Sequence, residues 1–86
     1  MPEISRFYGV VIQMYYGDHA PPHFHALYAG AVVKIAIETL EILDGGLPAR
    51  AMRLVLEWAA LHRGELLEAF RRAVSLEAPG KIAPLE

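Results

Sequence analysis

The chain gathers its histidines in one short segment, GDHAPPHFHALYAG at residues 17–30. Three of the four, His19, His23 and His25, fall within seven positions, and two prolines separate the first from the others. Residues two apart on a strand point the same way, so His23 and His25 start roughly 6–7 Å apart, close enough to share a metal ion. A bend at the prolines would return His19 or Asp18 as a third ligand. Three imidazoles, or two with a carboxylate, suit a divalent metal such as zinc or nickel.

Two other roles fit the same segment. A histidine that titrates near neutral pH can act as a general base, as in small bacterial ribonuclease toxins. The candidate catalytic residues are then His23, His25, Tyr15 and Lys34. Alternatively, the histidines are ordinary polar residues of an exposed sheet face, bonded to the backbone or to a neighbouring chain, and Asp18-His19 forms a turn.

Composition limits the classes of partner and cofactor that the chain can bind. The formal net charge of −2 disfavours general nucleic-acid binding, which Lys and Arg drive by neutralising phosphates. The chain has no cysteine, so a metal must be held by His, Asp or Glu. No stretch approaches the roughly 20 apolar residues that span a membrane, and the N-terminal residues lack signal-peptide features. We therefore expect a cytoplasmic protein of one domain, residues 1–86.

The first half of the chain predicts strands and the second half a helix. Aromatic and β-branched residues dominate the expected strands, which are 7–16, 23–29, 31–38 and an edge strand at 41–43. After Pro48 the composition favours a helix through residue 76, and the spacing of its apolar residues continues in phase past Gly64.

These elements predict an α+β domain. A small antiparallel sheet of three to four strands, about residues 4–44, packs one face against a long C-terminal helix, residues 48–76. The helix can kink near Gly64, and an extended tail, residues 77–86, follows it.

One helix covers only one face of such a sheet. Hydrophobic residues make up 55% of the chain, above the roughly 45–50% that is usual, so part of this surplus can serve an interface. The interface candidates are Phe7, Val11, Leu27 and Val32 on the uncovered face, and Trp58 on the helix. Trp58 fits either core packing or a role as an interface anchor.

Three motifs in combination carry a family resemblance: ISRFYG at 4–9, DHAPPHFHA at 18–26 and LPARAMRLVLEWAALHRGELL at 47–67. Together they resemble the domain-of-unknown-function 4160 family over nearly the whole chain. The sequence departs from the family pattern at Leu40, where a glycine is common, and at Gly64, which replaces a helix former. The resemblance implies a compact bacterial protein, and members are often encoded beside another small protein, which implies a partner.

The leading hypothesis is therefore a protein–protein interaction module, either one half of a two-gene, toxin–antitoxin-like unit or a homodimer. The alternatives are a His-dependent, ribonuclease-like toxin and a metal-binding protein that uses His19, His23 and His25 with Asp18.

Overall fold

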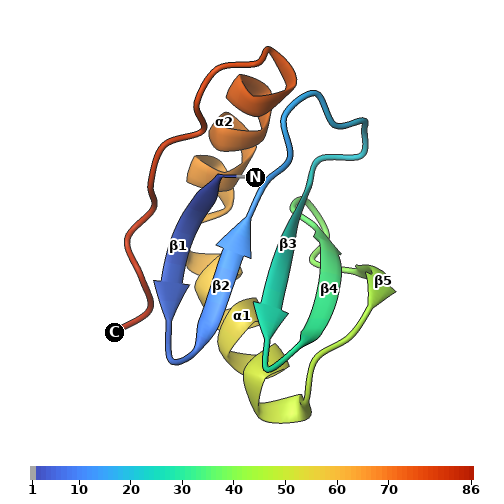
Figure 1. Cartoon of the computed structure of the whole chain (residues 1–86), viewed down its shortest axis with the longest axis vertical. Coiled ribbons are helices and arrows are strands. Elements are labelled where there is room, and N and C mark those ends of the chain that lie inside the picture. The colour runs from blue at the N-terminus through green and yellow to red at the C-terminus, as the bar shows by residue number, and fades with distance from the viewer. Residues whose placement is uncertain (1) are drawn as a thin grey trace.

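The computed structural model describes residues 2–86 as a five-stranded antiparallel sheet with two helices (Figure 1). The strands lie in chain order across the sheet, and they are β1 (Glu3–Phe7), β2 (Val10–Gln13), β3 (His23–Tyr28), β4 (Ala31–Ala36) and β5 (Ile42–Gly45). The helices are α1 (Ala49–Leu61) and α2 (Arg63–Val74). This confirms the α+β class, with one strand and one helix more than expected. None of the helices in residues 2–86 is long and apolar enough to cross a membrane.

The additional strand comes from a tight turn inside the segment expected to be a single strand, 7–16. Tyr8 and Gly9 both have positive φ, 48° and 83°, which is the backbone of a two-residue hairpin turn. Ala29 and Gly30 repeat this geometry between β3 and β4, with φ of 48° and 86°. The chain therefore reverses at Tyr8, and Phe7 pairs with Val10 across the hairpin.

This pairing moves Phe7 to the face of the sheet that packs against the helices. Directly paired residues of antiparallel strands point to the same face, and Val10 is fully buried in the core. Phe7 is buried there too, with its ring centroid 5.4 Å from that of Trp58. The expectation that Phe7 lies on the uncovered face is therefore wrong, and Trp58 is a core residue rather than a surface anchor.

The two helices meet at His62, so the helix expected over 48–76 with a possible kink near Gly64 is instead two helices. His62 has φ −125° and ψ 25°, outside the helical region. Its N–H donates to the carbonyl of Ala59 at the end of α1, and its carbonyl accepts a hydrogen bond from the N–H of Leu66 in the first turn of α2. The ring of His62 packs 5.4 Å from Trp58 and bonds Glu65. The break therefore lies two residues before Gly64.

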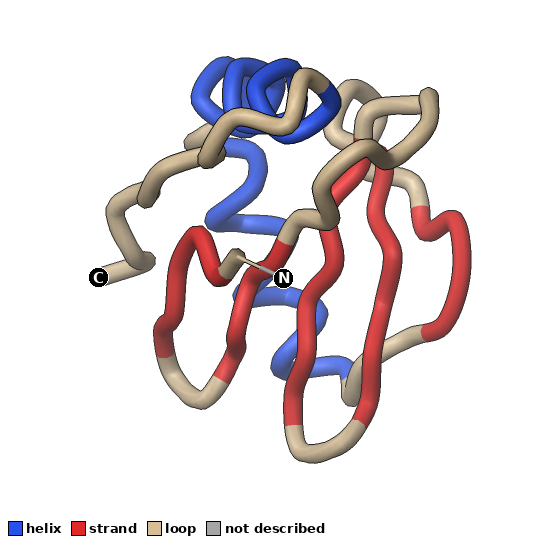
Figure 2. Tube along the Cα trace, turned by 45° about the horizontal axis from the view of Figure 1, so that its top comes forward, coloured by secondary structure: helices blue, strands red, loops and turns tan. Residues whose placement is uncertain are grey.

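The helices take different positions on the sheet. Figure 1 shows α1 behind the sheet and α2 near the end where β3 begins. Figure 2 shows α2 lying beside the loops at that end. Gly17 of the β2–β3 loop donates its N–H to the carbonyl of Ala73 in α2, at 2.9 Å. The opposite face of the sheet faces the viewer in Figure 1. We call it the open face, and α2 reaches it at His23, where the ring of Phe70 packs.

The C-terminal segment runs along the outer edge of β1 (Figure 1). The N–H of Ile82 bonds the carbonyl of Ile4 at 2.8 Å, and Lys81 Nζ bonds the carbonyl of Glu3 at 2.7 Å. The indole N–H of Trp58 donates to the carbonyl of Ala83 at 2.8 Å. These three bonds attach the tail both to the sheet edge and to α1.

Candidate metal centre

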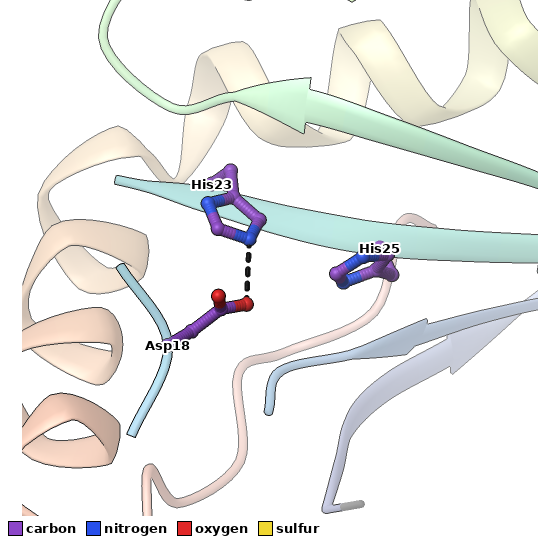
Figure 3. A group of neighbouring side chains, drawn as sticks. All are labelled: Asp18, His23 and His25. Carbon is purple, nitrogen blue, oxygen red and sulfur yellow. Dashed lines mark hydrogen bonds and ion pairs between the residues drawn. The ribbon is translucent and has the colours of Figure 1, made fainter. Parts of the chain in front are cut away.

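The β2–β3 loop places Asp18 over the start of β3 (Figure 3). The bond from Gly17 to Ala73 fixes the loop against α2 on one side of Asp18. On the other side, the N–H of Ile37 donates to the carbonyl of Pro22 at 3.0 Å, which continues the β3–β4 pairing. The carboxylate of Asp18 is therefore held next to the side chains of β3 by backbone bonds on both sides.

Asp18 and His23 form a short hydrogen-bonded pair. His23 Nε2 lies 2.7 Å from Asp18 Oδ2, and the backbone N–H of His19 donates to Oδ1 at 2.8 Å. Burial alone would raise the pKa of Asp18. The His19 N–H and the His23 ring, with a smaller contribution from Lys34, stabilise the carboxylate more strongly and leave its pKa below the usual value. Asp18 is therefore ionised at neutral pH, and its carboxylate can accept hydrogen bonds or coordinate a metal ion.

The second nitrogen of His23 is also engaged. Nδ1 lies 2.7 Å from the carbonyl oxygen of Pro21, which can only accept, so Nδ1 carries a hydrogen. Its partner at Nε2, the Asp18 carboxylate, is also an acceptor. Nε2 therefore donates a hydrogen to Asp18 in this contact, and a metal ion bound here would take the place of that hydrogen. An imidazole whose Nδ1–H is bonded to a backbone carbonyl is the usual arrangement of a metal-ligating histidine.

His23 is nearly enclosed by protein. Its side chain is only 2% exposed, and the ring of Phe70 in α2 packs against it with centroids 5.5 Å apart. This environment fixes the ring, so that Nε2 has one direction in which to bind. It also means that α2, whose position follows from the break at His62, forms one wall of the site.

His25 lies on the same side of β3, two residues further along (Figure 3). Its ring centroid is 5.4 Å from that of His23 and 4.4 Å from that of Tyr15, which stands edge-on to it. Burial is the main cause that lowers the pKa of His25; His23 and Lys34 lower it further, and Asp18 opposes them. His25 Nδ1 is buried without a hydrogen-bond partner in the described residues. A neutral imidazole with an unused nitrogen is a competent metal ligand.

Asp18, His23 and His25 together lie close to the arrangement that one metal ion requires. One ligand atom from each residue lies within 4.8 Å of the others. Tetrahedral Zn²⁺ with bonds of about 2.0–2.1 Å keeps its ligand atoms roughly 3.3 Å apart. Binding would draw His25 inward, and Nε2 of His23 and Oδ2 of Asp18, now at 2.7 Å, would separate by about half an ångström.

The structure separates His19 from the other metal-ligand and catalytic candidates. His19 is exposed and only its backbone touches Asp18, so Asp18 and not His19 completes the group formed with His23 and His25. Tyr15 contacts His25, and Lys34 is directly opposite His25 on β4. Tyr15, Lys34 and His23 are therefore all neighbours of His25.

The remaining interface candidates lie in one row on the open face. Val11 of β2, Leu27 of β3 and Val32 of β4 are direct neighbours across the three strands. Val32 is 46% exposed, and the other two are half-buried.

Two contributors to the site were not among the residues expected to act. Gln13 is opposite His25 on β2, and its Oε1 is buried without a partner in residues 2–86. Strand alternation already places Gln13 on the face of His25, and the pairing of the two residues follows from the strand register. The Pro21 carbonyl is a backbone group that only the loop geometry brings to His23.

Comparison with known proteins supplies a family but no described activity. A search of curated proteins and a search of solved structures each returned no match. The family model described as a domain of unknown function (DUF4160) matches residues 9–71, a range that contains Asp18, His23, His25, Gln13, Lys34 and most of both helices. The chain belongs to this domain of unknown function family, DUF4160.

Proposed function

We propose that this chain is a cytoplasmic protein that binds one divalent transition metal ion through Asp18, His23 and His25. The observation that carries the proposal is the convergence of Asp18, His23 and His25, whose ligand atoms lie within 4.8 Å of one another. The unpartnered Nδ1 of His25 supports it, because buried polar atoms are almost always bonded. Two imidazoles and one carboxylate favour Zn²⁺ or a neighbouring first-row ion over Ca²⁺ or Mg²⁺.

The three ligands leave room for chemistry at the ion. A tetrahedral ion with three protein ligands keeps a fourth position for water or a substrate. His25 is only partly buried, and we place the fourth position on its exposed side. The closed Cys- and His-rich sites that only stabilise a fold lack such an opening.

The test uses untagged protein stripped with a chelator, because a histidine tag would add its own ligands. Titration calorimetry with Zn²⁺ should show one ion per chain. His25→Gln should weaken binding at least about 100-fold, since losing an outer-shell partner alone costs about 10–100-fold. His19→Gln is the matched control from the same loop and should bind as the wild type does.

His23 is buried, so His23→Gln can lose binding merely by unfolding. His25→Gln and Asp18→Asn change less enclosed side chains, and circular dichroism verifies that they fold. A wild type that takes up no ion, or a His25→Gln variant that binds as tightly as the wild type, would overturn the proposal.

A second candidate function concerns the edge of the sheet. We propose that β5 pairs with β5 of a second copy of the chain. An edge strand offers unpaired N–H and C=O groups, and the side chains here are apolar and exposed: Ile42 by 53%, Leu43 by 42% and the neighbouring Val32 by 46%. The opposite edge, β1, already carries the tail.

Size-exclusion chromatography with light scattering tests this pairing. The wild type should elute as a dimer, and Ile42→Lys should elute as a monomer. Leu61→Lys is the control, because Leu61 is 69% exposed on α1, which takes no part in the sheet. A monomeric wild type overturns the pairing, and adding the product of a neighbouring gene shows whether a different small protein occupies this edge.

A further inference from the structure

Two buried polar atoms without partners belong to residues that are directly opposite each other in the sheet. Gln13 of β2 is in register with His25 of β3. Three buried side-chain atoms in residues 2–86 have no hydrogen-bond partner, and two of them are Gln13 Oε1 and His25 Nδ1. Directly opposite residues point to the same face, with Cβ atoms about 4.5–5.5 Å apart. Because buried polar atoms are almost always bonded, this coincidence points to a bond between the two side chains.

The chemistry of the two atoms sets the direction of such a bond. An amide oxygen only accepts, so Nδ1 of His25 must carry the hydrogen. Burial is the main cause that lowers the pKa of His25, which favours the neutral ring with a single hydrogen. With that hydrogen on Nδ1, the lone pair is on Nε2. The hydrogen bond at one ring nitrogen therefore decides which nitrogen can bind a metal.

His23 already shows the same arrangement on the same strand. Its Nδ1 lies 2.7 Å from the Pro21 carbonyl oxygen, and its Nε2 faces Asp18. Metal-ligating histidines almost always donate their other ring N–H to an oxygen of the surrounding protein or to water. The side-chain carbonyl of Gln13 would serve His25 as the backbone carbonyl of Pro21 serves His23.

We propose that Gln13 is a positioning residue of the metal site, whose Oε1 accepts the Nδ1 hydrogen of His25 and directs Nε2 to the ion. This inference rests on the proposed metal site and adds a residue that touches no ion. The two atoms do not bond in the structure, so we expect the Gln13 amide to turn onto Nδ1 as His25 moves toward the ion.

The test follows the ring hydrogen of His25. Long-range ¹H–¹⁵N NMR of the wild type loaded with Zn²⁺ should place this hydrogen on Nδ1, in slow exchange with water. Gln13→Leu should speed the exchange and weaken Zn²⁺ binding by roughly 10–100-fold, as is typical for loss of an outer-shell partner. Gln13→Glu retains an acceptor oxygen and should restore slow exchange and binding. Val11→Thr is the matched control on the same strand and face, and should behave as the wild type does.

The outcomes separate this inference from the metal site itself. A wild type that takes up no Zn²⁺ overturns both. If Zn²⁺ binds and the ring hydrogen is on Nε2, His25 binds through Nδ1 and the positioning role alone is overturned. The same holds if Gln13→Leu matches the wild type in affinity or in exchange, or if Gln13→Glu exchanges as fast as Gln13→Leu. A thermal melt verifies that each variant is folded.

Discussion

Gly45, the last residue of β5, is the position where a single methyl group should do the most damage. Its φ is +71°, and a Cβ built there would overlap the carbonyl oxygen of Val32 on β4. That same oxygen accepts the N–H of Gly46 at 3.1 Å. An alanine at Gly45 must therefore push β5 away from β4 and break this bond.

The size of the effect follows from two contributions. A left-handed backbone costs an L-residue about 1–2 kcal/mol, and loss of the Gly46 hydrogen bond costs about 1 kcal/mol more. The sum is roughly 2–3 kcal/mol of unfolding free energy. For a domain of this size each kcal/mol lowers the Tm by about 4–8 °C, so Gly45→Ala should melt roughly 8–24 °C below the wild type.

Two other glycines separate these contributions. Gly30 has φ +86°, and an added Cβ there would meet no atom within 4 Å, so Gly30→Ala carries the backbone cost alone. Gly46 has neither a positive φ nor a close neighbour, and Gly46→Ala should be within about 0.5 kcal/mol of the wild type. Calorimetric melts of the three variants measure the series. If Gly45→Ala loses no more stability than Gly30→Ala, the contact between the added methyl group and the Val32 carbonyl does not destabilise the protein, and the reasoning is refuted.

Two further predictions concern the helices. Trp58→Phe removes the indole donor to the Ala83 carbonyl. It should lower the free energy of unfolding in urea by roughly 1–3 kcal/mol and speed amide exchange in the tail. Unchanged exchange would show that this bond does not hold the tail. Hydrogen bonds from Arg71 and Arg72 lower the pKa of Glu68 from 4.5, so its stabilisation is present above about pH 4.5 and lost as pH falls through the lower folded value. Glu68→Gln should therefore slightly reduce the fall of Tm below about pH 4.5, and an unaltered profile would contradict the assignment.

The apolar periodicity located the core well but not the turns. Val10, Ile12, Phe24 and Val33 are all fully buried, as their alternation predicts. The turn at Tyr8-Gly9 was missed because an aromatic residue with positive φ is unusual, and Gly9 alone is a weak turn signal. Because strands alternate with period two, the missed turn also put Phe7 on the wrong face.

The helix break was expected only approximately, as a kink near Gly64, and the choice between Asp18 and His19 depends on contacts that local sequence does not contain. No proline or glycine occupies position 62; the break is accompanied by packing of His62 on Trp58 and its bond to Glu65. Asp18 and His19 are adjacent, and only the path of the loop, bonded to α2 through Gly17, decides which side chain faces His23. The residue types of the site were therefore predictable, and the selection among them was not.

The two edges of the sheet differ in a way that bears on aggregation. The tail occupies the edge at Ile4 through the N–H of Ile82, while β5 remains open. A sheet that can be extended from one side only stops growing once two copies have joined, because joining uses both free edges. Deleting residues 80–86 would restore a second edge and permit indefinite head-to-tail stacking. The tail thus covers part of the β1 edge, so that on the proposed pairing through β5 the assembly is limited to two copies.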